Sequence, residues 1–366
     1  MEQTPGVSNW QTYCTLKRPG VMRLLSYQAV AHGSDTVMFF QMRRSIGACE
    51  KYHSAVIDHA GHENTRIFRE VAKLGEELEK IGGEILGARA ASRAALVIDW
   101  DNWWAAEYSA GPTRLIDYKK EIFCYYKAFA ENNISVDIIG VKDDLSAYKL
   151  VAAPLLYMCK SGFDEKVRSY VADGGCFLTT YFSGYVEEHD LVVTGGYPGK
   201  LRDILGIWVE ESDAVPEGKQ NSFTYKGEVY PATVLCDLLH LEGAQEISSY
   251  RSDFYAGMPV LTCNNYKKGR AYYVATRSSD KFYRNLVGDI CEKEGIAPLL
   301  ETPEEVEVSR RENANTIFLF LLNHGEKEAK VPVNRVGIDL LTGKKYDAGD
   351  MITLLPKDVA ILKQIK

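Results

Sequence analysis

The sequence predicts an α/β protein whose central part is a parallel sheet covered by helices on both faces, followed by a small antiparallel β domain. From about residue 94, short apolar runs alternate with amphipathic helices, which is the pattern of strands buried on both faces. After Pro298 the helices stop, and short β-prone runs alternate with turns. With 366 residues, of which 46% are hydrophobic and 25% charged, the chain is globular and long enough for two or three domains.

The first ninety residues contain too few predicted elements to close a core. The run 36–40 is typical of a buried strand, and a helix follows a polar loop that contains histidines. Asn64 or Thr65 can cap this helix, and Gly82-Gly83 is expected to end it. Its apolar residues recur three or four positions apart: Ile67, Val71, Leu74, Leu78 and Ile81. One strand and one helix cannot form a domain, so this segment is expected to belong to something larger.

Between residues 94 and 294 the pattern predicts strands and helices in alternation. Strands are expected at 94–98, 136–139, 150–157, 176–180 and 271–275, and helices at 118–132, 163–172 and 282–294. The stretch 187–265 is rich in Gly, Asp and Ser, and it is predicted to be an insertion of loops and short strands. The C-terminal β domain is predicted from the runs 306–308, 316–321, 331–333 and 359–362.

Charge and composition exclude several classes of function. The formal net charge is -7 and there is no long run of Lys or Arg, which argues against nucleic acid as a partner. No stretch approaches the roughly 18 apolar residues of a membrane span, and no signal peptide is recognised, so a cytoplasmic protein without a membrane partner is expected. The 8 cysteines form no C-x-x-C pair and the 7 histidines no H-E-x-x-H motif, so no metal site is predicted. Most cysteines are expected to be buried thiols.

The phosphate-binding and nucleophile motifs that would make the sheet domain an active site are incomplete. The stretch 194–200 lacks the first glycine of a P-loop, and Leu201 follows Lys200 where a Ser or Thr is needed, so a structured surface loop is expected. Class I amidotransferases share this sheet topology and carry a cysteine at a strand-to-helix elbow. Cys176 instead comes at the start of a predicted strand, and neither G-x-C-x-G nor G-x-S-x-G occurs.

Four segments, taken in order, match the pattern of one known family. They are M-E-Q-T-P at residues 1–5 with Asn9-Trp10, G-A-C-E-K-Y-H at 47–53, D-W-D-N-W-W at 99–104, and the stretch 195–208. In this order and spacing they resemble the family 42 glycoside hydrolases, mostly β-galactosidases, through essentially the whole chain. The first segment resembles the nucleophile strand of that family and the second its substrate-binding loop, while the other two resemble its second domain.

The resemblance implies three domains. Residues 1–90 would be the last two βα units of a TIM (β/α)8 barrel, a fold that needs about 250 residues. Residues 91–299 would be a flavodoxin-like or class I amidotransferase-like domain that mediates trimer formation, and residues 300–366 a C-terminal antiparallel β domain. The resemblance therefore implies a homotrimer, and it admits a complementing chain that carries the rest of the barrel.

By the same resemblance, Glu2 is the nucleophile of a retaining β-galactosidase and attacks the anomeric carbon of a terminal β-D-galactoside. Trp10 would wall the sugar site, while Glu50 and His53 would hydrogen-bond galactose hydroxyls. This chemistry requires no cofactor. A retaining glycosidase also needs a second carboxyl group as acid/base, which in this family is a Glu directly after an Asn. No Asn-Glu dipeptide occurs in the sequence, so the isolated chain is predicted to be inactive.

Two other hypotheses follow from the sequence. The chain could be a non-catalytic oligomerisation module of a split or truncated glycosidase, and an active amidotransferase-like enzyme would require a reactive cysteine of low pKa. Without the family resemblance, Glu2 is a mobile terminal carboxylate, Trp10 a packing residue, and Glu50 with His53 a solvated turn. Two barrel strands without their neighbours are also expected to expose apolar faces and unpaired edges.

Some residues of the quoted segments are interpreted as structural. Asp99, Trp103 and Trp104 are expected to fix the first strand-to-helix turn of the sheet domain and to pack it against a neighbour. His59 and His62 are interpreted as loop residues without a role.

Overall fold

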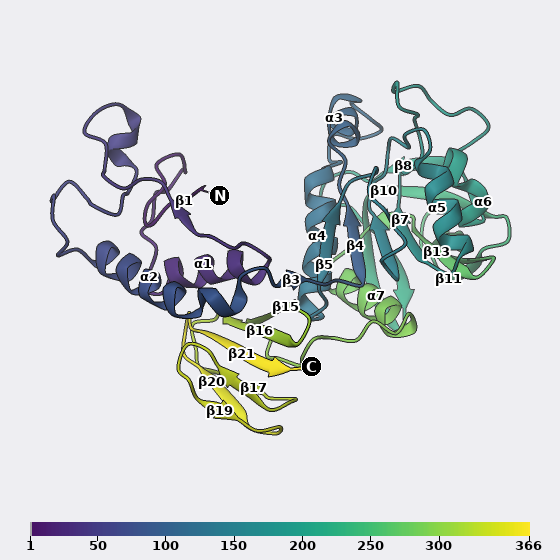
Figure 1. Cartoon of the computed structure of the whole chain (residues 1–366). Coiled ribbons are helices and arrows are strands. Elements are labelled where there is room, and N and C mark those ends of the chain that lie inside the picture. The colour runs from purple at the N-terminus through teal and green to yellow at the C-terminus, as the bar shows by residue number, and fades with distance from the viewer. Residues whose placement is uncertain (1) are drawn as a thin grey trace. The chain divides into compact units, whose positions relative to one another are not determined.

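The computed structural model describes residues 2–366, which divide into two compact units (Figure 1). One unit combines the N-terminal segment up to Ala91 with Pro298–Lys366, and the other is Ser92–Ala297. The N- and C-terminal segments therefore share one unit. The boundaries of three separate domains stay a prediction. Within residues 2–366, no helix is both long enough and apolar enough to cross a membrane.

The unit 92–297 is built around a seven-stranded sheet with the order β11-β12-β13-β7-β6-β4-β5. The strands from β13 to β5 run parallel, and β12 (Pro259–Tyr266) and β11 (Gln245–Ser249) extend one edge in antiparallel fashion. The parallel strands are β4 (Ala94–Val97), β5 (Val136–Ile139), β6 (Leu150–Ala153), β7 (Cys176–Thr180) and β13 (Gly269–Val274). The predicted strands are present, although the sheet is mixed rather than wholly parallel.

Helices cover both faces of this sheet (Figure 1). On one side α4 packs against α7, and α5 and the short α6 lie on the other, while α3 directly follows β4. The bounds are α3 (Trp100–Tyr108), α4 (Tyr118–Glu131), α5 (Phe163–Ala172), α6 (Arg202–Leu205) and α7 (Asp280–Lys293). The three helices predicted in this unit are therefore present, and α5 has the predicted bounds.

Local chemistry explains where several of these elements start and stop. The side chain of Asp117 accepts a hydrogen bond from the N–H of Lys120 at 2.9 Å, which caps the first turn of α4. β6 ends at Ala153, earlier than the predicted run 150–157, because Pro154 has no N–H to donate to the ladder.

The stretch 187–265 is more regular than predicted. It contains two long antiparallel strands, β8 (Ile207–Ala214) and β10 (Glu228–Leu241), which form a second sheet with β9 (Asn221–Tyr225) and β14 (Thr276–Arg277). The expectation of loops and short strands is wrong for this part. In β8 the buried Ile207 and Val209 are followed by the exposed Glu210 and Glu211, so the apolar signal of this strand is short. The stretch 194–200 does lie in a largely exposed loop, as predicted.

The N-terminal segment alternates two short strands with two helices: β1 (Glu2–Gln3), α1 (Val21–Ala31), β2 (Met38–Phe39) and α2 (Arg66–Ile85). β1 and β2 pair in parallel, with Glu2 opposite Met38. The sequence analysis missed α1. It also predicted a buried strand at 36–40; a strand is present at Met38–Phe39, but it is only partly buried, because Met38 is 53% exposed whereas Phe39 packs against the core beside α1 and α2. Among the described residues β2 pairs only with β1.

α2 begins as predicted and ends later. The Oγ1 of Thr65 accepts a hydrogen bond from the N–H of Phe68 at 3.2 Å and caps the helix. The helix then continues through Gly82-Gly83 to Ile85, so the predicted end is wrong. Each glycine costs about 1 kcal/mol relative to alanine in a helix. Ile81 and Ile85 are 2% and 3% exposed, and burying them offsets that cost.

The C-terminal segment forms an antiparallel sheet, as predicted, with the order β19-β18-β21-β16-β15-β3. The edge strand β3 (Arg89–Ala90) comes from the N-terminal segment, and β17 and β20 pair separately. The other bounds are β15 (Val306–Glu312), β16 (Thr316–Asn323), β17 (Ala329–Pro332), β18 (Gly337–Asp339), β19 (Lys345–Tyr346), β20 (Met351–Leu354) and β21 (Val359–Ile365).

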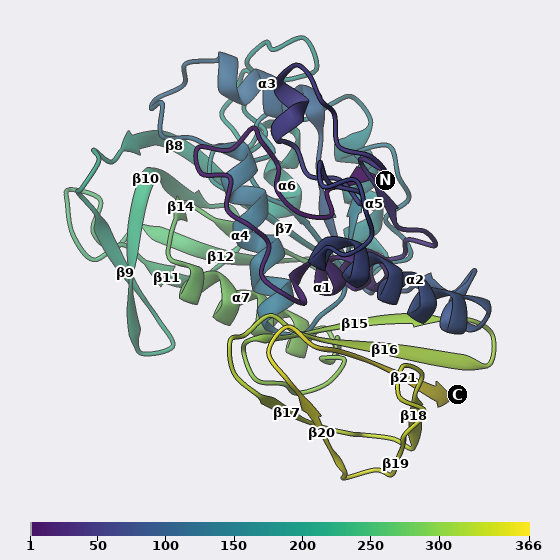
Figure 2. The same cartoon turned by 90° about the vertical axis from the view of Figure 1, so that its left-hand side faces the viewer.

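β16 is buried on both faces because alternate side chains enter two different cores. Its even-numbered side chains pack with α1 and α2, and its odd-numbered ones with β17 and β20. They are Phe318, Phe320 and Leu322, and Ile317, Leu319 and Leu321, respectively. Figure 2 shows α1 and α2 on one side of β15 and β16, with β17 and β20 on the other.

Three polar residues of β15, spaced two positions apart, hold the C-terminal end of α1: Glu307, Ser309 and Arg311. We call them the polar seam. Ser309 Oγ donates to the carbonyl of Ala31 at 2.9 Å. The guanidinium of Arg311, which is 1% exposed, binds Asp35 and donates to the backbone carbonyls of Val30, Ser34 and Ala88. Hydrogen-bond donors and a positive charge at a helix C-terminus satisfy its free carbonyls and stabilise its dipole.

Candidate active site

Glu2 lies on β1, and the next residue, Gln3, holds that strand in place through the hydrogen bonds of its side chain and carbonyl group. The side chain of Glu2 is exposed. Gln3 donates from Nε2 to the carbonyl of Leu25 at 3.4 Å and accepts from Ser26 Oγ at 3.2 Å, both on α1. The N–H of Phe40 donates to the carbonyl of Gln3 at 2.8 Å. The strand that carries Glu2 is therefore held between α1 and the end of β2, while its carboxylate is free to meet a ligand.

Trp10 and His53, predicted to share the sugar site, lie in contact. Their ring centroids are 5.6 Å apart, and Phe40 meets His53 edge-on at 5.4 Å. Trp10 is 60% exposed, whereas His53 is 4% exposed. The Nδ1 of His53 lies 3.1 Å from the carbonyl oxygen of Ser54. Because a carbonyl only accepts, Nδ1 carries the proton, and Nε2 of the neutral ring is left to accept from a ligand hydroxyl.

The loops that carry these two rings are tied together by hydrogen bonds. Asn9 Nδ2 donates to the carbonyl of Cys49 at 2.6 Å, and the N–H of Ser54 donates to the carbonyl of Val7 at 3.0 Å. Glu50 lies in a short 3-10 helix, Cys49–Tyr52, and its carbonyl accepts from the N–H of His53 at 2.9 Å. Glu50 is half-buried. The segment 49–54 and the loop after β1 therefore form one local structure.

Two buried polar atoms around this structure have no partner among the described residues: Asn9 Oδ1 and Gln41 Nε2. Buried polar groups are nearly always hydrogen-bonded, so unpaired ones at a candidate site point to a ligand or water. Asn9 directly precedes Trp10 in the first of the four family segments, and this position could have identified it as a site residue from the sequence. Gln41 follows the apolar run 36–40, and nothing in the sequence singled it out.

Three of the four predicted site residues are connected in the structure, whereas Glu2 is not connected to them. It brings Trp10 into contact with His53 and links Glu50 to His53 through the backbone. In residues 2–366, no hydrogen bond or ion pair joins the side chain of Glu2 to these three. The roles of all four residues therefore stay predictions at this point. His59 is a loop residue, as expected, and its Nε2 lies 2.8 Å from the carbonyl oxygen of Ser45.

The turn after β7 contains a non-glycine residue with positive φ, but that residue is not a nucleophile. Phe182 follows β7 with φ 61, a conformation that side chains rarely adopt, and it is 4% exposed. Its N–H donates to Asp237 Oδ2 at 3.0 Å. Cys176 begins β7, as predicted, and burial raises its pKa well above the usual value. An amidotransferase-like cysteine would need an exposed thiol of low pKa, so this unit has no such nucleophile among its buried thiols.

The turn after β4 is fixed as predicted by Asp99 and Trp103. Lys160 Nζ lies 2.7 Å from Asp99 Oδ1, and the N–H of Asp99 donates to the hydroxyl of Tyr118 at 3.1 Å. The ring of Trp103 packs against Tyr118 with centroids 6.2 Å apart. Trp104 is 53% exposed and its ring centroid lies 6.4 Å from that of Trp100, so its packing against a neighbour stays a prediction.

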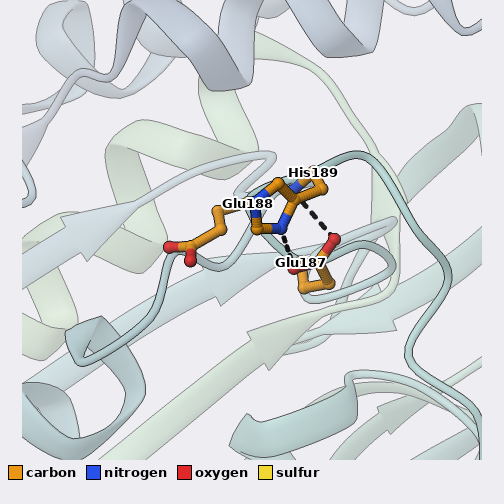
Figure 3. Close-up of side chains that lie close together, drawn as sticks. All are labelled: Glu187, Glu188 and His189. Atoms are coloured by element: carbon orange, nitrogen blue, oxygen red, sulfur yellow. Dashed lines mark hydrogen bonds and ion pairs between the residues drawn. The ribbon is translucent and has the colours of Figure 1, made fainter.

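The described residues bring together one group of three ligand-type side chains, Glu187, Glu188 and His189, whose donor atoms lie within 4.8 Å of one another (Figure 3). They are consecutive in an exposed loop. His189 Nδ1 already lies 2.9 Å from Glu187 Oε2, and this hydrogen bond raises the pKa of His189. The group is explained as a surface ion pair, and no metal is assigned to it.

Three family models match the chain in order. They are described as Beta-galactosidase at residues 1–81, Beta-galactosidase trimerisation domain at 92–297, and Beta-galactosidase C-terminal domain at 305–364. All three are models of the family 42 glycoside hydrolases, and the trimerisation-domain model alone covers more than half of the chain. The chain belongs to this family. The resemblance drawn from the four sequence segments is therefore confirmed.

Members of this family with known structure or sequence match the chain from end to end. Beta-galactosidase BgaP of Planococcus sp. (strain L4) is 47% identical over 371 residues, which are 100% of this chain and 55% of that protein. BgaB of Geobacillus sp. (strain Y412MC61) is 41% identical over 366 residues, 100% of this chain and 54% of that protein. A crystal structure of the β-galactosidase from Bacillus circulans sp. alkalophilus superposes with a TM-score of 0.97 at 50% identity, covering 100% of this chain and 55% of that one.

The family 42 chain thus spans about half the length of the curated relatives it matches. Its α/β class agrees with these structures, which confirms the predicted fold class at that level.

Proposed function

We propose that this family 42 chain is the nucleophile-bearing part of a retaining β-galactosidase that hydrolyses terminal β-D-galactosides. The β1-α1-β2-α2 segment would be the last two βα units of a (β/α)8 barrel. The observation that carries the proposal is the contact between Trp10 and His53 beside β1, in loops joined by Asn9. Chemistry at the C-terminal ends of strands is the rule for such barrels.

In the proposed reaction, a carboxylate oxygen of Glu2 bonds to the anomeric carbon as the bond to the leaving group breaks. Water then hydrolyses the glycosyl-enzyme. The exposed carboxylate of Glu2 on a strand held from both sides supports this role. A second carboxyl group has to protonate the leaving oxygen, and family 42 places it after an Asn. Because this sequence lacks that dipeptide, the acid comes from outside residues 1–366, and the chain alone is inactive.

Galactose recognition is assigned to the joined loops. The exposed face of Trp10 would pack on the C–H groups of the pyranose. Glu50 and the Nε2 of His53 would accept hydrogen bonds from hydroxyls. Among the described residues, Asn9 Oδ1 and Gln41 Nε2 are an unpaired acceptor and an unpaired donor in the segments that carry these residues, and because both atoms are buried, water is the partner they would take.

We also propose the three-domain arrangement with segments 1–90, 91–299 and 300–366, and a homotrimer that forms through the second. The description of the model matched at 92–297 supports that assembly. A complementing chain or segment with the remaining barrel units would complete the site. All the cysteines in the described residues are free thiols, which fits a reducing compartment such as the cytoplasm. The chemistry uses no cofactor.

Covalent trapping tests the proposal. The chain is combined with the N-terminal barrel part of the Planococcus relative and treated with 2,4-dinitrophenyl 2-deoxy-2-fluoro-β-D-galactoside. The dinitrophenolate leaves without a general acid, and the fluorine slows hydrolysis, so a nucleophile accumulates as its glycosyl ester. We expect one fluorogalactosyl adduct on the peptide that contains Glu2.

Two variants make that experiment specific. Glu2→Gln should abolish the adduct, whereas Glu63→Gln, which changes an exposed loop carboxylate of the same unit, should leave it intact. A folded complex that takes up no label would favour the alternative, a non-catalytic oligomerisation fragment of a glycosidase. A label on another carboxylate would move the nucleophile away from Glu2.

A further inference from the structure

Helix α3 exposes its largest side chains and buries its small ones. Trp100, Trp104 and Tyr108 are 60%, 53% and 86% exposed, while Asn102 and Ala106 are buried. The three aromatic residues are four positions apart, so their side chains lie along one stripe of the helix. We call this stripe the aromatic face of α3. A surface helix that packs only against the core of its own unit directs its apolar side chains toward that core, and α3 does the opposite with these three residues.

The orientation of α3 is fixed from its buried side. Asn102 donates from Nδ2 to the carbonyl of Leu155 at 3.0 Å and accepts from the N–H of Met158 at 2.7 Å. Lys160 forms ion pairs with Asp99 and Asp101 at the start of the helix. These bonds hold the helix to the end of β6, so the aromatic face is presented outward by the fold and not by a loose helix.

The exposed area is large for an unused surface. A Trp or Tyr side chain buries about 150–250 Å² when covered, so the exposed fractions here amount to about 400 Å². The largest apolar patch on a monomer is typically about 300–600 Å² and is often functional. A standard interface covers about 800 Å² on each partner. The aromatic face of α3 can therefore supply about half of one side of a stable interface.

The charged groups beside the aromatic face favour a protein partner over a carbohydrate. Asp101 is paired with Lys160, and Glu107 accepts a hydrogen bond from Trp103 Nε1. Sugars are recognised by aromatic rings combined with free hydrogen-bonding groups, and here the adjacent carboxylates are already engaged. Exposed Trp and Tyr without free charges are the composition of an interface hot spot.

We infer that the aromatic face of α3 contacts a second copy of this chain in the assembled trimer. The inference rests on the proposed homotrimer and names the surface that forms it. α3 lies inside the segment 92–297, whose matching model is described as a trimerisation domain. In a closed ring of three, each contact joins two different patches, so the face meets another surface of the neighbouring copy.

Oligomeric mass measured by light scattering on the full chain tests this inference. The test variant is Trp104→Lys combined with Tyr108→Lys, because lysine keeps the helix propensity and favours a helix C-terminal turn. Wild type is expected at about three times the 41.0 kDa chain mass, and the variant at the mass of one chain. Loss of two hot-spot residues should raise the dissociation constant at least about 100-fold. Phe254→Lys changes another exposed aromatic residue of the same unit and should leave the trimer unchanged.

The outcomes separate two kinds of failure. A wild-type chain that is monomeric at every concentration overturns the homotrimer and this inference with it. A trimeric variant overturns the inference alone, and if that variant has also lost affinity for a β-galactan oligosaccharide, the aromatic face is assigned to a carbohydrate instead. If the variant does not fold, dilution of wild type decides the question. Trp100 and Trp104 should then shift their fluorescence to longer wavelength as the mass falls, and an unchanged spectrum would contradict the inference.

Discussion

Asp237, a buried carboxylate beside the turn at Phe182, has four hydrogen-bond donors, whereas two buried polar atoms in the segments around Trp10 and His53 have no partner among the described residues. Asp237 is buried and accepts hydrogen bonds from the N–H of Phe182 and from the hydroxyls of Tyr197, Ser212 and Tyr273. Burial raises its pKa, and these donors oppose the rise. Asn9 Oδ1 and Gln41 Nε2, in contrast, have no partner among the described residues.

The difference separates a scaffold from a site. A buried carboxylate surrounded by donors makes the fold rigid and offers a substrate no accessible surface. An exposed carboxylate and an exposed aromatic ring are groups that a sugar can contact. Phe182 has the positive φ of a strained turn, but its buried ring contributes only to packing against Tyr157 and Tyr185.

The largest expected effect tests the site side of this comparison. In the chain completed with the barrel part of a relative, Glu2→Gln should lower kcat for an aryl β-galactoside by about 10⁴-fold or more, because the amide cannot form the glycosyl ester. Steady-state kinetics measure this, with Glu63→Gln as the control that keeps wild-type rates. A loss of less than tenfold would mean that Glu2 is not the nucleophile.

The next effect tests whether the polar seam of β15 stabilises the N-terminal segment. Arg311→Met leaves Asp35 and three carbonyls without their buried donor, which should cost about 3–5 kcal/mol of unfolding free energy. Urea titration followed by hydrogen exchange should show α1 losing protection at lower urea, while α5 stays protected. The exposed Arg335→Met should change stability by less than about 0.5 kcal/mol. Equal losses in α1 and α5 would contradict a local role.

A smaller effect concerns the pH dependence of the same seam. Burial alone would raise the pKa of Glu307, but hydrogen bonds from His32, His324 and Gln28 outweigh it and lower the pKa to about 2. Stability from this carboxylate is therefore present above its unfolded pKa near 4.5 and is lost as the pH falls toward 2. The loss should reach at most about 3 kcal/mol.

Thermal unfolding of the unit that contains α1, measured from pH 5 to pH 2, checks this expectation. Glu307→Gln removes the titrating group, so its stability should fall less steeply than that of wild type over this range. Parallel curves would show that other carboxylates cause the acid loss.

The elements that could be predicted from sequence have clear local boundaries. α5 and β7 have their predicted bounds, since glycines flank them at Gly162 and at Gly174-Gly175. Elements decided by tertiary contacts could not be predicted. α2 runs past Gly82-Gly83 because Ile85 is buried against other parts of its unit, and of the two residues of β2 only Phe39 packs against that core while Met38 is exposed.

The candidate site followed from the family resemblance and not from spacing. Trp10 and His53 are far apart in the sequence, and no periodicity brings them together. The bond from Asn9 to Cys49 that joins their loops depends on the folded chain. The pattern of Glu307, Ser309 and Arg311 was equally uninformative, because alternating polar residues on a strand usually indicate a solvated face. Their role became visible only when α1, which the sequence analysis missed, was in place.

The smallest expected effect tests whether Trp10 contributes to substrate binding or to the chemical step. Trp10→Leu removes an exposed ring that packs on His53, and an aromatic pair of this kind contributes about 0.5–1.5 kcal/mol. In the completed enzyme KM for an aryl β-galactoside should rise about 3–10-fold with kcat nearly unchanged, because the ring would bind ground state and transition state alike. Tyr13→Leu, which changes an 82% exposed ring of the same loop, should leave both constants unchanged. A fall in kcat at constant KM would instead place Trp10 in the stabilisation of the transition state, and its contact with His53 would then be part of the chemistry.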